Sequence, residues 1–296
     1  MGSGYWEQIA VLASINAIVA LGFYVTFLTG QLSAAHAAFI GVGAYGAGLL
    51  TMKLGVPFLV AVLTASLASA FVAAVLAGLL RRLTGMFLAI GTLAFAEIMI
   101  VVLKNAPALG GALGINGVPL RTTIWHVLAV LIVLVVVFWK LDGSRVGLRF
   151  RAVREDAKAA AAMGIDVGRT RIVAFACGGF LCGLGGALQV HYLGVMEPDD
   201  LGFAMTVSLL LFTVIGGRDY FAGPIFGAIL FTVLPELLRV SARGRLAIFS
   251  TLLVLIVILW PDGLIKRPVF WSFRRDKNQG RESSRDGAVD APLKVK

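Results

Sequence analysis

Glu97 is the acidic side chain that the sequence places deepest inside an apolar run. It lies in the segment Gly91-Thr92-Leu93-Ala94-Phe95-Ala96-Glu97-Ile98, well inside a stretch long enough to cross a membrane. Because a carboxylate is costly within a bilayer, an acidic residue at this depth is a functional candidate by default. It would line a translocation pathway or bind a proton. The alternative is a structural role, through an ion pair with Lys104 or a hydrogen bond to a neighbouring helix.

Ser33 and His36 are a second set of polar groups inside an apolar run. On a helix they lie one turn apart on the same face, where their side chains can act together. Such a pair suits either a translocation pathway or a hydrogen-bonded clamp between helices, and we favour the clamp.

The sequence offers no catalytic machinery. It contains no G-x-x-x-x-G-K-[ST] phosphate loop, no G-x-S-x-G elbow and no Cys/His metal cluster. Gly41–Gly46 matches G-x-G-x-x-G literally, but no Asp or Glu lies between Glu7 and Glu97 to bind a ribose, so these glycines indicate close helix packing instead. We therefore expect no enzyme, no metal and no cofactor of its own, and an energised pump would need its motor on another chain.

Composition identifies the elements that carry these residues as membrane helices. The chain has 296 residues, of which 59% are hydrophobic and 14% charged, and its mean hydropathy is +0.92. A water-soluble fold is excluded, and the apolar runs lack the period-2 alternation of a barrel strand. The prediction is an all-α, polytopic membrane protein with about nine transmembrane or re-entrant helices. The candidate spans are 8–29, 33–52, 57–80, 84–103, 123–140, 171–194, 203–217, 221–240 and 246–263.

Charge gives the predicted topology. The net charge is +10, and two stretches, 140–171 and 261–296, together supply +8 of it. Basic segments beside apolar spans are typical of the cytoplasmic side, which explains the charge better than nucleic-acid binding does. Arg81 and Arg82 then also lie inside, while 104–122 and Glu197–Asp200 lie outside. If 33–52 is re-entrant rather than spanning, the N-terminus moves from outside to inside.

The outer segment 104–122 is rich in glycine and contains two prolines. Glycine permits positive φ and close backbone approach, so this segment is a candidate entrance or gate, with a plain external loop as the alternative. Its candidate pathway residues are Gly110, Gly111 and Gly114.

The segment 147–165 is predicted to be a short cytoplasmic helix. It has no Gly or Pro from Leu148 to Met163, and Gly164 stands where a left-handed cap would end it. Phe150 and Val153 lie on a small apolar face surrounded by charges. Such a helix suits docking into a groove on another protein, and the alternative is an interfacial helix on anionic membrane lipid.

Several ordered blocks of the sequence resemble the LivM-type permease subunits of branched-chain amino acid ABC importers. The resemblance covers most of the chain and rests on the blocks Gly30-Gln31-Leu32-Ser33…His36-Ala37-Ala38-Phe39, Thr92-Leu93-Ala94-Phe95-Ala96-Glu97-Ile98, Arg154-Glu155-Asp156…Ala162-Met163-Gly164-Ile165 and Gly223-Pro224-Ile225-Phe226-Gly227-Ala228.

The resemblance implies a multi-pass subunit of the bacterial inner (plasma) membrane. It would pair with a LivH-like second permease, two cytoplasmic ABC ATPase subunits that use the ATP, and a periplasmic or external solute-binding protein. The segment 147–165 would then be the loop presented to the ATPase. The positions that the resemblance carries over to this coupling are Glu155, Asp156 and Gly164. Arg154 and Ala159, in the same segment, complete the coupling candidates.

The chain departs from the family pattern in the outer segment. Ala108-Leu109-Gly110-Gly111 stands where a Thr-Gly-Gly start is usual, and related systems import urea or short amides, so the solute stays open. We expect a permease domain over 1–265, with its coupling loop at 141–170, and a basic, disordered cytoplasmic tail over 266–296. The alternative function is a proton-coupled secondary transporter that uses Glu97.

Overall fold

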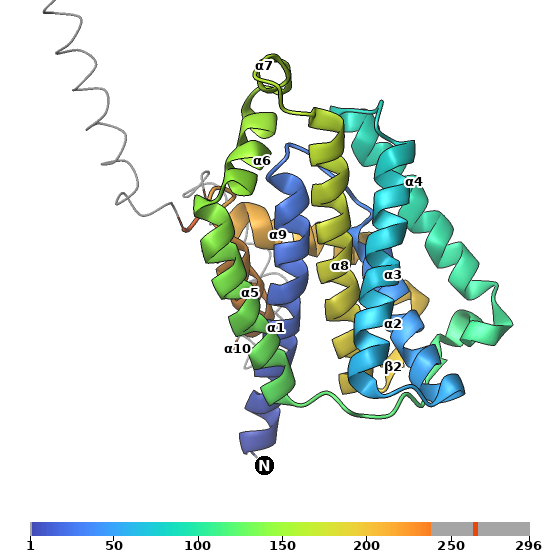
Figure 1. Cartoon of the computed structure of the whole chain (residues 1–296). Helices are drawn as coiled ribbons and strands as arrows, with labels where there is room; N and C mark the ends of the chain where they lie inside the picture. Colours follow the sequence, from blue (N-terminus) through green and yellow to red (C-terminus); the bar gives the residue numbers. More distant parts are fainter. Residues whose placement is uncertain (1, 238–262, 266–296) are drawn as a thin grey trace, which may run out of the picture. The chain divides into compact units, whose positions relative to one another are not determined.

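The computed structural model describes residues 2–237 and 263–265, and most of these residues are helical. The long helices are α1 (Gly2–Phe27), α2 (His36–Leu54), α3 (Phe58–Leu79), α4 (Gly85–Lys104), α5 (Ile124–Gly143) and α8 (Val167–Leu193). Shorter helices are α6 (Arg145–Glu155), α7 (Ala157–Ala162), α9 (Phe203–Gly216) and α10 (Ala222–Leu237) (Figure 1). Three 3-10 turns, η1 (Pro107–Leu109), η2 (Gly111–Leu113) and η3 (Pro198–Leu201), and the two-residue strands β1 (Ile115–Asn116) and β2 (Val195–Met196) complete the described elements.

The predicted all-α, polytopic class is confirmed. Within the described residues, six helices are long and apolar enough to cross a membrane, and α9 and α10 are shorter apolar helices. They match the first eight predicted spans with shifts of a few residues at their ends. The last residues of the eighth span, nearly all of the ninth and the tail 266–296 lie outside the described residues.

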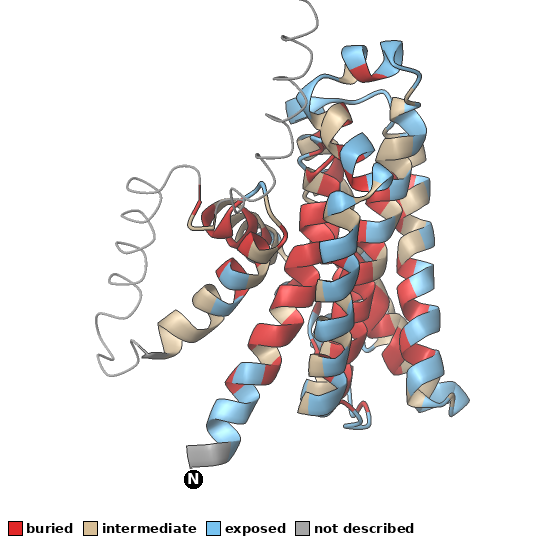
Figure 2. Cartoon of the chain, turned by 60° about the vertical axis from the view of Figure 1, so that its left-hand side comes forward, coloured by how far each residue is buried: buried red, intermediate tan, exposed pale blue. Residues whose placement is uncertain are grey.

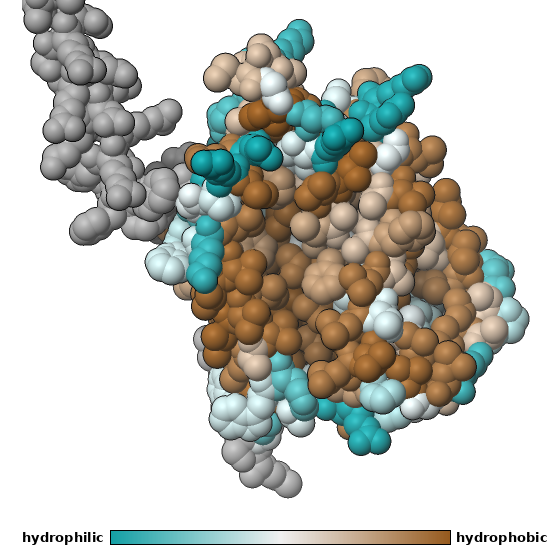
Figure 3. Space-filling model, viewed as in Figure 1, coloured by the Kyte–Doolittle hydropathy of each residue, from teal (hydrophilic) through white to brown (hydrophobic). Residues whose placement is uncertain are grey.

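The surface agrees with a membrane setting. The face seen in Figure 3 is apolar over the middle of the helices, and its polar residues gather toward the two ends of the helices. Helices α6 and α7 lie at one end together with the α3–α4 connection that holds Arg81 and Arg82, whereas the N-terminus and β2 lie at the other (Figure 1). The segments predicted to be inside and outside are therefore separated along the helices.

Helix α8 forms the centre of the packing, between α1, α2 and α3 (Figure 1). Its glycines allow backbones to touch: a Cβ on Gly186 would lie 2.1 Å from the Ile40 carbonyl oxygen, and a Cβ on Gly179 would lie 2.3 Å from the Ala73 Cβ. On α2, a Cβ on Gly43 would lie 2.0 Å from the Gly183 carbonyl oxygen. The glycine clusters thus serve helix packing, as predicted.

Burial is uneven among the helices. The helix that starts at the marked N-terminus in Figure 2, α1, is buried along its central turns. Helix α4, by contrast, carries exposed apolar side chains along much of its length, among them Met86, Phe87, Ile90 and Ile98. A weakly covered helix of this kind is available for contacts beyond the described part of the chain.

Candidate functional site

The α1–α2 connection, residues 28–35, brings non-helical backbone among the membrane helices. The Ala34 N–H donates to the Thr92 hydroxyl at 2.9 Å, and the Ala34 carbonyl accepts from the Thr206 hydroxyl at 3.2 Å. Thr92 lies seven residues into α4, about 10 Å along its axis, so Ala34 lies well inside the length of that span. Irregular backbone at membrane depth is tolerated where protein buries it or where it lines a cavity.

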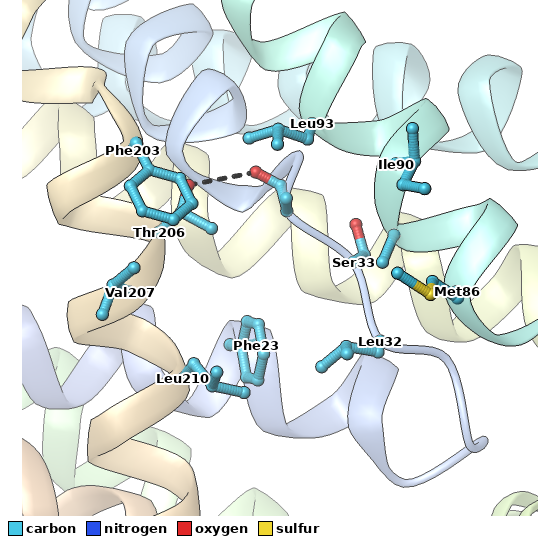
Figure 4. A pocket seen from close by; sticks show the side chains of 12 residues that line it. Phe23, Leu32, Ser33, Met86, Ile90, Leu93, Phe203, Thr206, Val207 and Leu210 are labelled. Atoms are coloured by element: carbon cyan, nitrogen blue, oxygen red, sulfur yellow. Dashed lines mark hydrogen bonds between the residues drawn. The ribbon is translucent and has the colours of Figure 1, made fainter.

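A cavity of about 260 Å³ lies beside this connection, between α4 and α9. Figure 4 shows Met86, Ile90 and Leu93 of α4 facing Phe203, Val207 and Leu210 of α9 across it, with Phe23, Leu32 and Ser33 between them. Its lining is almost entirely apolar because the polar groups nearby bond to one another: Thr206 bonds to Ala34, the dashed line in Figure 4. The cavity can hold a small apolar group.

Ser33 and His36 lie in different surroundings and have different roles. Ser33 lines the cavity, and its hydroxyl accepts from the Ala35 N–H at 3.2 Å. His36 is fully buried, with Nε2 3.0 Å from the Thr26 hydroxyl and Nδ1 3.2 Å from the Ser33 carbonyl. Its ring packs against three phenylalanines in tilted and edge-on arrangements and does not line the cavity. This geometry is that of a clamp between α1 and the start of α2.

Glu97 is exposed on α4, on the same helical stripe as Met86, Ile90 and Leu93 and one turn beyond Leu93. Among the described residues it has no hydrogen-bond or ion-pair partner. Lys104 binds Asp199 instead, with Nζ 2.5 Å from Oδ1, so the alternative of a Glu97–Lys104 ion pair is not found in the described part of the chain. The carboxylate faces away from the chain's own packing.

The outer segment is folded over the ends of α2 and α4. Gly110, Gly111 and Gly114 all have positive φ, and a Cβ on Gly114 would lie 2.2 Å from the Met196 carbonyl oxygen. Strand β1 pairs with β2, and the Lys53 ammonium donates to the Ala108 carbonyl at 3.0 Å. The three glycines shape this cover and do not line the cavity.

The predicted helix over 148–163 is wrong in one respect, because the structure divides it at Asp156. Asp156 is extended and accepts from the Lys158 and Ala159 N–H groups at 2.8 and 3.0 Å, so it caps α7. Asp prefers this capping position to a helix interior, and its carboxylate competes with the continuing helix for those donors. Helices α6 and α7 are therefore separate elements joined by one residue, and Gly164, at φ +81°, follows α7.

The coupling candidates divide into exposed residues and one that points inward. Glu155, Asp156, Ala159 and Gly164 are exposed. Arg154 instead turns toward the chain, where Nη2 lies 2.9 Å from the Asp219 carboxylate and Nη1 donates to the Arg218 carbonyl at 3.2 Å. The exposed four form a surface that another protein can contact, whereas Arg154 ties that surface to the α9–α10 connection.

Arg154 also contacts the α1–α2 connection. Its guanidinium lies 5.6 Å from the centre of the Phe27 ring, and a Cβ on Gly30 would lie 3.4 Å from the Arg154 Cα. Its side chain is only 18% exposed, which makes these contacts closer to an interior linkage than to a solvated surface pair. Arg151, one turn before Arg154, ties α6 to α5 by binding the carboxylate of Asp142, at 2.8 Å, and its carbonyl.

Sequence reasoning missed Thr92, Thr206 and Asp219. Each holds an irregular connection by a polar contact to residues distant in sequence. The available signal for the two threonines was a hydroxyl inside an apolar span, which is equally compatible with bonding to its own helix. Among the described residues no group of three His, Cys, Asp or Glu is placed to hold a metal.

The comparisons with known proteins agree with this architecture. The family model described as "Branched-chain amino acid transport system / permease component" matches residues 5–260. The chain is 29% identical to the "High-affinity branched-chain amino acid transport system permease protein LivM" of Escherichia coli K12 and of Salmonella typhimurium, over 87% of this chain and 69% of each relative. It is 26% identical to the corresponding LivH protein of Salmonella typhimurium, over 50% of this chain and 48% of that protein. No solved structure matches.

Proposed function

The chain belongs to the branched-chain amino acid transport permease family, and from this premise we propose that it is the transmembrane permease subunit of an ATP-driven importer. It translocates branched-chain or related amino acids that an external solute-binding protein delivers. The chain is a LivM-type, multi-pass protein of the bacterial inner membrane. It catalyses no reaction itself, and the ATP is used by partner subunits.

The observation that carries the proposal is the arrangement of α6 and α7. A capped, exposed segment at one end of the helices is joined by Arg154 to two connections, one of which, 28–35, reaches in among the membrane helices. A surface contact alone would not move the transmembrane helices. The Arg154 contacts supply a mechanical connection from the segment to the α1–α2 and α9–α10 connections.

The movement driven by ATP is transmitted through these two connections. A displacement of α6 carries Gly30 and Asp219 with it, because both lie against Arg154. Ala34, four residues after Gly30, is held by Thr92 of α4 and Thr206 of α9. Displacement of the ATPase-facing segment therefore changes the position of α4 relative to α9, on the two sides of the cavity.

The proposed assembly pairs the permease domain 1–265 with a LivH-like second permease, two ATPase subunits and the solute-binding protein. Similarity to both LivM and LivH supports a pair of related permeases, since the names of these two relatives assign both to a high-affinity branched-chain amino acid transport system. The tail 266–296 is proposed to lie on the ATPase side because it is basic.

The test is purification of the tagged chain from its native membrane in mild detergent, with partners identified by mass spectrometry and uptake measured in proteoliposomes. We expect a second permease and an ATPase to co-purify in stoichiometric amounts, and leucine uptake that requires ATP and the solute-binding protein. A chain that purifies alone and transports with a pH gradient in place of ATP would overturn the proposal in favour of the proton-coupled alternative.

A matched pair of variants tests the coupling surface. Glu155 is exposed and lies next to the cap, so Glu155→Arg reverses a charge without removing a contact to the described chain. We expect uptake to fall while membrane abundance stays unchanged. Glu7→Gln, an exposed change at the opposite end of the helices, serves as the control and leaves uptake unaltered.

A further inference from the structure

We propose that the cavity between α4 and α9, together with Glu97, is a binding subsite for the transported amino acid: the cavity holds the branched aliphatic side chain and Glu97 binds the α-ammonium group. The proposal rests on the proposed function and adds to it a place in this chain where the solute is held during translocation. It assigns side-chain selectivity to residues of α4 and α9.

The cavity fits an aliphatic group and excludes a charged one. Its volume of about 260 Å³ is near the lower end of small-molecule sites, and its exposed lining is almost entirely apolar. The hydroxyls of Ser33, Thr92 and Thr206 all bond to backbone groups. Nothing in the lining can replace the water around an ammonium or a carboxylate, so only the side chain of an amino acid can enter.

Glu97 lies just outside the cavity and can bind the ammonium group, for which the apolar lining offers no partner. Residues four apart on a helix have neighbouring side chains, about 5–6 Å between Cβ atoms, so the carboxylate lies next to Leu93 at the cavity wall. In leucine, isoleucine and valine the ammonium is only a few bonds from the branch of the side chain. A solute whose branch touches Leu93 therefore brings its ammonium within reach of Glu97.

Contact with lipid does not explain why Glu97 is exposed. It is flanked by exposed apolar residues, Ile98 and Val101, near the middle of α4. A carboxylate facing hydrocarbon is strongly disfavoured, and such residues face a cavity or a polar partner instead. The Lys104 ammonium is taken by Asp199, so it is not held for Glu97. A transient cation, the solute's own ammonium, satisfies this requirement during transport.

The proposed subsite also borders the 28–35 connection, through which movement of α6 is transmitted. Ser33 and Ala34 of the 28–35 connection form part of the cavity wall, and the Gly30 end of this connection contacts Arg154. Movement of α6 would therefore change the cavity that holds the side chain. Solute release is then linked to the ATPase through residues of this chain.

The first experiment labels the site. The assembled transporter in proteoliposomes, energised with ATP and supplied with solute-binding protein, is illuminated with a leucine analogue that carries an aliphatic diazirine. We expect label on cavity residues of α4 and α9, identified by peptide mass spectrometry, and loss of most of it when excess unlabelled leucine is present. Label that excess leucine does not reduce would identify a non-specific apolar cavity and overturn the proposal.

The second experiment measures selectivity with matched variants. Ala89 lines the cavity and Ala94 does not, although both lie on α4. We expect Ala89→Leu to lower leucine and isoleucine uptake more than valine uptake, shifting the ratio on the order of tenfold, the usual effect of a methylene-sized misfit. Ala94→Leu leaves the ratio unchanged. Equal ratios in both variants would contradict a side-chain site here.

Glu97 is tested by charge removal at constant size. We expect Glu97→Gln to lower leucine uptake per assembled complex by roughly tenfold or more, because about 1.4 kcal/mol of lost attraction is already tenfold. Glu7→Gln is the control carboxylate. Wild-type uptake in Glu97→Gln would remove Glu97 from the site. Failure of the unmodified complex to import leucine with ATP would instead count against the proposed function itself.

Discussion

Helices α8 and α4 are both apolar enough to cross a membrane, yet they are covered by protein to very different extents. In the most apolar window of each helix, 67% of the residues of α8 are buried, against 28% for α4. The mean hydropathy runs the other way, 1.7 for α8 and 2.4 for α4. Hydropathy therefore distinguishes membrane from water but does not tell which helix lies inside the protein.

Small residues explain the difference. Gly179, Gly183 and Gly186 of α8 each lie where an added Cβ would overlap α2 or α3, so their absence of a side chain allows close helix packing. On α4, a Cβ on Gly91 would approach only the end of the Leu83 and Leu80 side chains, at 3.3 Å or more. We call α1, α2, α3 and α8 the packed core, and α4, α9, α6, α7 and the connection 28–35 the working side.

The largest expected effect is overpacking of the packed core. Gly186→Val places a branched side chain where even Cβ would lie 2.1 Å from the Ile40 carbonyl oxygen, and backbone cannot yield as a side chain does. We expect a loss of about 3 kcal/mol or more of stability and little folded protein in the membrane. The measurement is the yield of monodisperse protein in detergent and its melting temperature.

Gly91→Ala is the matched change on the working side. Its Cβ meets only flexible leucine ends, and alanine favours the helix by up to about 1 kcal/mol over glycine. We expect yield and melting temperature near those of the parent. Similar losses in both variants would mean that α4 is packed as tightly as α8, and the distinction between the two regions would fail.

The next effect concerns transport rather than folding. Arg154→Ala removes the bond to Asp219, the bond to the Arg218 carbonyl and the contact with Phe27. We expect ATP-dependent uptake per assembled complex to fall on the order of tenfold, while melting temperature falls modestly, because Asp219 is half exposed and water can replace part of what its carboxylate loses.

Exchanging the two charges separates linkage from simple loss of a side chain. Arg154→Asp combined with Asp219→Arg restores the ion pair in reverse, and we expect part of the uptake to return relative to either single variant. If uptake in the double variant is no higher than in the less active single variant, the ion pair does not link α6 to the α9–α10 connection, and Arg154 acts through another contact.

A smaller effect is expected at the hydroxyls that hold the 28–35 connection. Thr92→Val keeps the shape of the side chain but leaves the partly buried Ala34 N–H without its acceptor, at a cost of about 1 kcal/mol. Because this connection forms the cavity wall, we expect uptake to fall several-fold. The measurement is initial uptake rate at saturating binding protein.

Thr64→Val on α3 is the control for that change. Within the described residues its hydroxyl bonds only to carbonyls of its own helix, at Val60 and Ala61, so no other described element loses a partner. Uptake should match the parent. A fall of equal size in the control would show that hydroxyl loss in any span is harmful, without special meaning for Ala34.

Periodicity and hydropathy were enough to predict the first eight spans, and the glycine clusters correctly indicated where helices pack closely. Three features of the structure could not be predicted from local sequence patterns. The depth of Ala34 depends on Thr92 and Thr206, which are far from it in sequence. The inward turn of Arg154 depends on Asp219, which no local pattern pairs with it. Lys104 was within reach of Glu97 along the helix, but Asp199 holds it through tertiary contact.

The smallest expected effect tests whether the break at Asp156 matters to the working side. Asp156→Asn keeps an oxygen that can accept from the Lys158 and Ala159 N–H groups, so α7 stays capped while the charge is lost. Asp156→Ala removes the cap, which is worth about 1 kcal/mol at a helix start.

If α7 serves as a positioned docking surface, the alanine variant should lose about two- to fivefold in uptake and the asparagine variant less. If both variants lose uptake equally, the carboxylate charge itself contacts the ATPase, and the capping role is secondary. The two variants therefore decide whether this residue acts on the shape of α7 or directly on the partner.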